Sequence, residues 1–177
     1  MEKVVNNVTV ECITGDIAAQ KDIVAVVNAA NAQLKIGGGV AGALHRAAGP
    51  GLEEECKPLA PIKPGEAVIT GAHNLPNDYV IHCLGPVYGA DRPEDKLLAD
   101  CYRNALQLAE DSKIDSVAFP SISTGAFGYP VEDAAKIAFQ TVKETTADLK
   151  QVRLIRFVLF GEDALAVHQQ KMEETFD

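Results

Sequence analysis

The sequence predicts an α/β fold, and two observations lead to this prediction. Short runs rich in Val and Ile alternate with longer stretches in which apolar residues recur at helical spacing. The chain has 177 residues, of which 47% are hydrophobic and 23% are charged, as is typical of a globular domain. A chain of this length buries about 70% of its unfolded surface without disulfides or metals. We therefore expect residues 1–177 to form a single domain.

The first half of the chain predicts four strands and one helix. Residues 9–13 and 23–28 are short apolar runs, and the second has the continuous pattern of a buried strand. Residues 40–48 are small and apolar and predict a helix, which Gly49-Pro50 should end. Pro58, Pro61 and Pro64 predict a rigid loop, after which residues 67–70 and 79–84 predict two more strands.

The second half predicts helices and strands in strict alternation. Residues 94–111 and 131–145 carry apolar side chains at helical spacing, for example Leu98, Cys101 and Ala105 on one face. Residues 116–119 and 154–160 predict strands, and residues 164–174 predict a closing helix. This alternation is typical of layered α/β proteins.

Composition excludes several classes of function. With 16 basic and 25 acidic residues the net charge is −9, and no basic cluster is present, so duplex nucleic acid is not expected as a partner. The longest apolar runs, 24–27 and 157–160, are far shorter than a span of ~20 residues, and the first residues lack the apolar stretch of a signal peptide. We expect a cytoplasmic protein with no membrane partner.

The cysteines and histidines show no spacing typical of a metal site or redox pair. The chain has no Cys-x-x-Cys, so we expect reduced, mostly buried cysteines and no bound metal. The residues concerned are Cys12, Cys56, Cys83 and Cys101, with His45, His73, His82 and His168.

The first segment with chemical information joins the strand at 23–28 to the helix at 40–48. It contains Gly37, Gly38 and Gly39 directly before Val40. Glycines allow a ligand to approach the main chain, and their N–H groups at a helix N-terminus favour an anion. A plain turn would need one glycine rather than three. The spacing also fits a dinucleotide fingerprint, but about nine residues separate it from its strand, which disfavours a nicotinamide dehydrogenase.

Two asparagines precede these glycines. Side-chain amides both donate and accept hydrogen bonds, which suits ribose hydroxyls or a positioned water. For Asn28 a ligand contact and a bracing role in the loop are equally open, because asparagine is also a common turn residue. Asn31 lies next to the glycine run, and there we favour a functional role.

A second loop, residues 120–130, again joins a strand to a helix. It contains Ser123, Thr124, Gly125, Ala126 and Phe127, and it is neither a P-loop nor a nucleophile elbow. Ligands of open α/β folds bind beyond the carboxyl ends of strands, where both glycine-containing loops should lie. Two phosphate-type loops indicate one elongated ligand with a diphosphate.

Three further residues have a structural and a functional interpretation. Asp16 caps a helix or accepts a hydrogen bond from an adenine amino group, and Ile17 follows it. Phe160, at the end of the last predicted strand, packs in the core or forms a stacking surface for a base. The residues alone favour the structural interpretation for Asp16 and Phe160.

Taken together, these segments resemble the macro domain family. The matching motifs run in family order over nearly the whole chain, and their combination is far more specific than any one of them. They are Gly15-Asp16-Ile17, Val26-Val27-Asn28-Ala29-Ala30-Asn31, Gly37-Gly38-Gly39-Val40, His45-Arg46-Ala47-Ala48-Gly49, Tyr79-Val80-Ile81-His82 and Ile122-Ser123-Thr124-Gly125-Ala126-Phe127-Gly128-Tyr129-Pro130. Within the family the chain looks most like the MacroD-type branch.

The resemblance implies a three-layer α/β/α fold with a mixed central sheet and a cleft for ADP-ribose, without a cofactor or metal. It implies hydrolysis of ester-linked ADP-ribose, on mono-ADP-ribosylated Asp or Glu or on O-acetyl-ADP-ribose, and we expect a monomer. Asp16 and Ile17 would then bind adenine and Phe160 would stack on it. The run from Gly37 to Val40 would contact the distal ribose and diphosphate, Ser123 to Phe127 would hold the diphosphate, and Asn31 with Gly38 and Gly39 would lie at the chemistry.

One position departs from the family pattern. MacroD-type hydrolases usually carry an aspartate after the Gly-Gly-Val, where it is thought to orient or activate water, and this chain has Ala41. Two hypotheses therefore stand: an ADP-ribosyl hydrolase or deacetylase of reduced activity, and a non-catalytic ADP-ribose-binding module. His45, one helical turn beyond Ala41, could replace the base, although a histidine packed against the sheet is the more ordinary interpretation.

Overall fold

The computed structural model describes residues 1–176, and the strands of this part of the chain form one mixed seven-stranded sheet. In chain order the strands are β1 (Glu2–Val5), β2 (Val8–Thr14), β3 (Ala25–Ala29), β4 (Ala67–Gly71), β5 (Tyr79–Cys83), β6 (Ser116–Phe119) and β7 (Leu154–Leu159). Their order across the sheet is β1-β2-β7-β6-β3-β5-β4. The five inner strands are parallel, and β1 and β4 pair antiparallel at the two edges.

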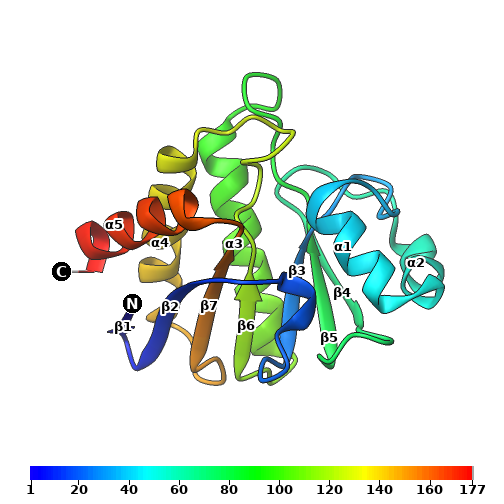
Figure 1. Cartoon of the computed structure of the whole chain (residues 1–177), viewed down its shortest axis with the longest axis horizontal. Helices are drawn as coiled ribbons and strands as arrows, with labels where there is room; N and C mark the ends of the chain where they lie inside the picture. Colours follow the sequence, from blue (N-terminus) through cyan, green and yellow to red (C-terminus); the bar gives the residue numbers. More distant parts are fainter. Residues whose placement is uncertain (177) are drawn as a thin grey trace.

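Helices cover both faces of this sheet, which confirms the predicted three-layer α/β/α fold (Figure 1). The helices are α1 (Gly39–Ala48), α2 (Pro50–Cys56), α3 (Glu94–Asp111), α4 (Val131–Thr146) and α5 (Glu162–Phe176), with short 3-10 helices η1 (Ile17–Ala19) and η2 (Lys57–Leu59). Residues of α3, α4 and α5 form the core on one face, and residues of α1, α2 and η1 form the core on the other.

The inner strands are apolar because helices bury both of their faces. All four residues of β6 are buried, and their side chains alternate between the two cores: Val117 and Phe119 belong to the core with α3 to α5, and Ala118 to the other. The continuous apolar runs of the sequence therefore marked these strands correctly.

The predicted strands and helices are all present, with ends that agree within two residues, but the sequence analysis missed β1 and α2. β1 is an edge strand of four residues, joined to β2 by Asn6 and Asn7, whose positive φ angles of 51° and 67° suit a tight hairpin turn. Gly49 ends α1 as predicted, with φ 84°, but Pro50 then starts α2, because proline fits the first turn of a helix.

Parallel inner strands bring the loops at their carboxyl ends to a single edge of the sheet (Figure 1). The first glycine-rich loop (residues 30–38) follows β3, and the second (residues 120–130) follows β6, the strand beside it. The two loops predicted to bind an anion are thus neighbours.

All four cysteines are free and buried. Over residues 1–176, no helix combines the length and apolar character needed to cross a membrane.

Candidate functional site

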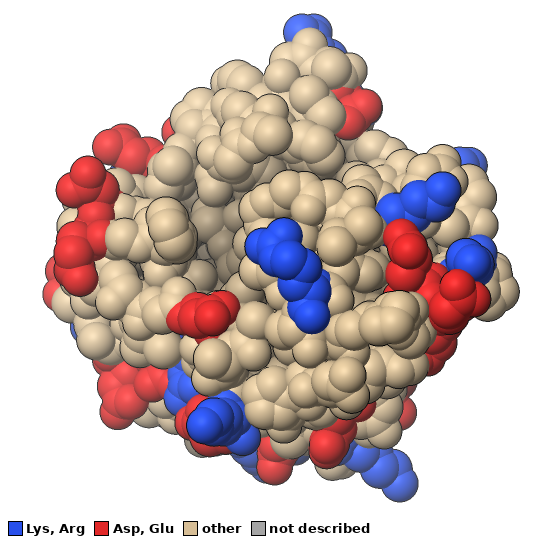
Figure 2. All heavy atoms as spheres, turned by 45° about the vertical axis from the view of Figure 1, so that its right-hand side comes forward, with Lys and Arg blue, Asp and Glu red and all other residues tan. Residues whose placement is uncertain are grey.

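A cavity of about 950 Å³ lies at this carboxyl edge of the sheet. It is visible as a hollow in the surface in Figure 2, surrounded mainly by uncharged residues. Its walls come from the segments that follow β2, β3, β5, β6 and β7. The lining residues are 15–17, 29–31, 37–41, 43, 85, 120–127, 131, 158–160 and 164.

The structure brings nearly all the predicted ligand-binding residues together in this cavity, although they come from four distant parts of the sequence. Those that line it are Asp16, Ile17, Asn31, Gly37, Gly38, Gly39, Val40, Ser123, Thr124, Gly125, Ala126, Phe127 and Phe160. Their contacts with a ligand stay predictions, since the structure fixes only their place.

Asn28 is the exception, and its predicted ligand contact needs correction. The residue is fully buried within β3 and does not line the cavity. Its Nδ2 lies 3.1 Å from Nδ1 of His82, the residue paired with it in the neighbouring strand β5. The amide thus braces two strands under the first loop, which was the structural alternative. Burial holds His82 in its neutral form and lowers its pKa to about 3.

The first loop leads into the N-terminus of α1, which is unlike that of the other long helices. Each of α3, α4 and α5 carries two acidic residues in its first turn, which compensate the positive end of the helix dipole. α1 has neither an acidic residue there nor a side-chain cap on Gly38. A Cβ at Gly38 or Gly39 would meet nothing within 4 Å. This helix end is therefore open toward the cavity and suits an anionic ligand.

Asn31 lines the cavity, and its side chain also shapes the first loop. The amide donates from Nδ2 to the Lys35 carbonyl over 2.8 Å, and Oδ1 accepts from the Lys35 N–H over 3.0 Å. Both ends of the amide thus hold the turn that precedes the glycines.

The second loop contains a buried hydroxyl without a partner among residues 1–176. Ser123 has a positive φ of 67° and is 6% exposed, and its Oγ forms no hydrogen bond there. The loop is closed on itself by a hydrogen bond of 2.9 Å from the Tyr129 N–H to the Ser123 carbonyl. An unpaired buried hydroxyl costs free energy. The Ser123 Oγ has almost no accessible surface and lies against Gly85, so the hydroxyl is packed within the loop and is not presented to the cavity.

Asp16 is the one charged residue among those described that line the cavity. Its Oδ1 accepts a hydrogen bond of 2.9 Å from the Ala18 N–H and so caps η1. The second carboxylate oxygen is left for a ligand, so the capping role and the predicted adenine contact are compatible. Because no basic residue described by the structure lines the cavity, main-chain N–H groups and helix α1 have to hold any phosphate.

Phe160 follows β7 at the rim of the cavity, and 98% of it is exposed. This excludes the core-packing interpretation that the residues alone favoured. An exposed aromatic ring beside Asp16 in one cavity fits the expected surface for a stacked base.

Ala41 also lines the cavity, in the first turn of α1. An aspartate at this position would therefore face the cavity, whereas the methyl group of Ala41 can neither accept nor donate a proton. His45 is 4% exposed, does not line the cavity, and its pKa is lowered mainly by burial. The hypothesis that His45 replaces the missing base is thus unsupported.

Gly85 also lines the cavity and was not predicted from the sequence. A Cβ at this position would overlap Oγ of Ser123 and would lie 2.6 Å from Cγ2 of Ile122, so only glycine fits against the second loop. The available signal was its position just beyond β5, at the same edge as the other loops. Val158 and Ala164, which also line the cavity, resembled ordinary core residues in the sequence.

Comparison with known proteins agrees with this geometry. The family model "Macro domain" matches residues 27–138. The chain is 48% identical to a macro domain-containing protein of Chlorobaculum tepidum over 168 residues, 94% of this chain and 97% of that one. It is 47% identical over 165 residues to the O-acetyl-ADP-ribose deacetylase of Klebsiella pneumoniae, covering 90% of this chain and 94% of that one.

Two solved structures are similar to the whole fold. The Oceanobacillus iheyensis macrodomain with ADP superposes with a TM-score of 0.94 at 40% identity, covering 98% of this chain and 95% of that one. The Trypanosoma brucei macrodomain in complex with ADP-ribose gives a TM-score of 0.83 at 34% identity, covering 91% and 68%. From motifs, fold, family model and relatives, the chain belongs to the macro domain family.

Proposed function

We propose that the cavity binds ADP-ribose and that the chain hydrolyses ester-linked ADP-ribose, either O-acetyl-ADP-ribose or mono-ADP-ribosylated Asp and Glu. The observation that supports this most is one cavity that combines two glycine-containing loops and the open N-terminus of α1 with an exposed ring and a carboxylate. The deacetylase name of the Klebsiella relative and the nucleotides bound by the two solved neighbours support the same reading.

Binding would use each wall of the cavity for one part of the ligand. The adenine would stack on Phe160, and its amino group would donate a hydrogen bond to the carboxylate oxygen of Asp16 that does not cap η1. The diphosphate would accept hydrogen bonds from the N–H groups of the second loop. The distal ribose would lie against the first loop and the start of α1, with Asn31 close by.

Hydrolysis would then need a water molecule placed beside the ester. In O-acetyl-ADP-ribose, the water oxygen attacks the ester carbonyl, the bond from this carbon to the ribose oxygen breaks, and acetate and ADP-ribose leave. In the Asp- or Glu-linked ester, water replaces the carboxylate at C1″ of the distal ribose. Gly38 and Gly39 leave room for this water, and Asn31 orients the ribose, so positioning and charge stabilisation carry the rate. Without a carboxylate at position 41, we expect slow turnover.

The second candidate function is a non-catalytic module that binds ADP-ribose. Ala41 is the observation that favours it, because a methyl group faces the cavity where the family aspartate would stand. This candidate shares all binding contacts with the first and differs only in turnover.

Incubation with O-acetyl-ADP-ribose and with an aspartate- or glutamate-linked ADP-ribosylated protein, followed by product analysis, separates the two. Hydrolysis releases acetate or the unmodified carboxylate, together with ADP-ribose. Gly38→Val is the matched control: Gly38 has an extended backbone with φ −83°, and its Cβ would meet nothing within 4 Å, so valine fills ligand space and leaves the fold intact. If ADP-ribose binds but neither ester is hydrolysed, the second candidate function, a non-catalytic ADP-ribose-binding module, remains.

A further inference from the structure

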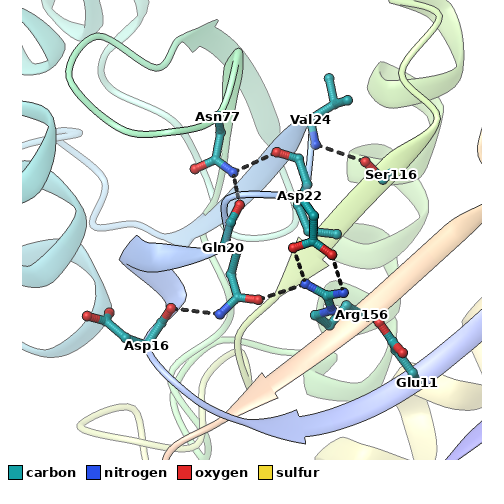
Figure 3. Close-up of polar contacts among 9 residues, drawn as sticks. Glu11, Asp16, Gln20, Asp22, Val24, Asn77, Ser116 and Arg156 are labelled. Atoms are coloured by element: carbon teal, nitrogen blue, oxygen red, sulfur yellow. Dashed lines mark hydrogen bonds and ion pairs between the residues drawn. The ribbon is translucent and has the colours of Figure 1, made fainter.

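A network of ion pairs and amide hydrogen bonds lies beneath η1, at the Asp16 end of the cavity (Figure 3). We call this set of residues the Arg156 network; it consists of Glu11, Asp16, Gln20, Asp22 and Arg156. It joins β2 and β7 to the segment that carries Asp16. Only Asp16 among its members lines the cavity.

The Arg156 guanidinium is held by carboxylates on two sides. Its Nε donates to Glu11 on the facing strand over 2.7 Å, and its Nη1 and Nη2 donate to the two oxygens of Asp22 over 2.8 and 2.7 Å. The Arg156 side chain is only 13% exposed, so this fork is a fixed part of the sheet surface.

This fork determines which way the amide of Gln20 points. Nη1 of Arg156 also donates to Oε1 of Gln20 over 3.0 Å, and since arginine has only donors, the amide oxygen must face it. The amide nitrogen of Gln20 then faces the opposite way and donates to the main-chain carbonyl of Asp16 over 2.8 Å. Gln20 is 7% exposed, so water offers little competition for these bonds.

The main chain of Gln20 is fixed as well. Asn77, in the loop between β4 and β5, donates from Nδ2 to the carbonyls of Gln20 and Ile23 over 2.8 and 2.7 Å. On the cavity side, the Gly15 N–H donates to the Leu159 carbonyl over 3.3 Å. The Gln20 side chain is thus fixed at both ends: its backbone is held by Asn77, and its amide nitrogen is bonded to Asp16, which lines the cavity.

We propose that Gln20, oriented by Arg156, is a positioning residue for adenine recognition, because it holds the Asp16 main chain so that the Asp16 carboxylate faces the base. This inference rests on the proposed function only in so far as the cavity takes an adenine nucleotide. Gln20 does not line the cavity, and the hydrogen bond from its side chain to the Asp16 carbonyl connects it to a residue that does.

Gln20→Glu tests this with almost no change of shape. A glutamate keeps its bond to Arg156, and the guanidinium keeps it ionised. Its second oxygen then faces the Asp16 carbonyl, so a hydrogen bond is replaced by repulsion between two acceptors. We expect the Asp16 turn to shift and ADP-ribose to bind about tenfold more weakly, within the roughly 10- to 150-fold that one lost charged hydrogen bond represents.

The experiment is a double-mutant cycle measured by calorimetry on the whole chain. ADP-ribose and ribose 5-phosphate are titrated into the natural chain, Gln20→Glu, Asp16→Ala and the double variant. We expect both single variants to bind ADP-ribose more weakly than the natural chain and to bind ribose 5-phosphate with unchanged affinity. In the Asp16→Ala background, Gln20→Glu should cost nothing more, because the carboxylate that Gln20 positions is already gone.

Gln107→Glu is the matched control. It makes the same charge change on an exposed face of α3, where Gln107 donates to Asp111 over 2.8 Å, and it should bind ADP-ribose like the natural chain. Equal losses for both ligands, or additive losses in the double variant, would overturn the proposal and leave Gln20 a general stabilising residue. If the natural chain binds ADP-ribose no better than ribose 5-phosphate, the adenine part of the proposed function itself fails.

Discussion

Ala41→Asp is the substitution that most sharply separates catalysis from binding. Ala41 is 5% exposed, lines the cavity and lies in the first turn of α1, two residues after its first residue. An aspartate there would face the cavity, at the end where we propose that the distal ribose binds. It would also stand near the positive end of the helix dipole, where a carboxylate stabilises a fold by about 0.3–1 kcal/mol.

The expected gain lies in the transition state. A positioned acid–base group contributes about 10²–10⁴-fold, so hydrolysis of the ester should rise by this factor, which corresponds to roughly 3–5 kcal/mol. Affinity for ADP-ribose should change by less than about tenfold, because the new carboxylate acts mainly on the attacking water.

Single-turnover hydrolysis of O-acetyl-ADP-ribose, with calorimetric affinity for ADP-ribose, measures both quantities. Ala41→Asn is the matched control, since an amide of the same shape orients water but accepts no proton at neutral pH. The reasoning is refuted if Ala41→Asn is as active as Ala41→Asp. Absence of turnover in the natural chain and in Ala41→Asp alike would leave only the binding module. A parallel Asn31→Ala variant should lose activity, and undiminished turnover there would place the chemistry elsewhere in the cavity.

Three further predictions concern binding and stability. Phe160→Ala should weaken the binding of ADP-ribose by about 1–3 kcal/mol through lost stacking. It should leave the melting temperature unchanged, because Phe160 is 98% exposed. Calorimetry and thermal melting check this, and a lower melting temperature with intact binding would contradict it. Gly85→Ala should lower the free energy of unfolding by about 1–3 kcal/mol and weaken the binding of ADP-ribose, since the new Cβ overlaps Oγ of Ser123. Urea unfolding measures this, and a stability equal to that of the natural chain would show that the second loop can move to make room. The pKa of His82 is about 3 in the folded state and near 6.5 in the unfolded state, so neutral His82 contributes its full stabilisation above pH 6.5. Between pH 6.5 and about 3 the free energy of unfolding should fall by roughly 1.4 kcal/mol per pH unit because of this residue. In His82→Gln, urea unfolding at several pH values should show a pH dependence smaller by one proton, and an unchanged pH dependence would show that His82 is not its source.

The sequence predicted the fold well where burial is continuous and patterns are long. The helix α3 and the strand β6 have the bounds that periodicity predicts, because packing and local preference agree there. β1 was missed since an edge strand of four half-exposed residues has almost no hydrophobic pattern. α2 was missed because Pro50 was read only as the end of one helix, although proline also starts helices.

The candidate site was predictable where its residues lie in contiguous glycine-containing loops. For Asn28 the sequence left both roles open, because a strand-end asparagine has the same sequence signature whether it points into the cavity or, as here, toward His82. Gly85, Gln20 and Arg156 contact segments that are distant in the sequence; Gln20 and Arg156, for example, are 136 positions apart. Such contacts depend on the order of strands in the sheet, which local patterns do not contain.

The most direct test of the account is a calorimetric titration of ADP-ribose at low and at high salt. Because Asp16 is the one charged lining residue among those described, the diphosphate should be held by main-chain N–H groups and a helix end. We expect one ligand per chain and an affinity that survives moderate salt. An affinity that collapses as the salt concentration rises would mean a site built on Lys and Arg, and no binding at either concentration would contradict the central claim outright.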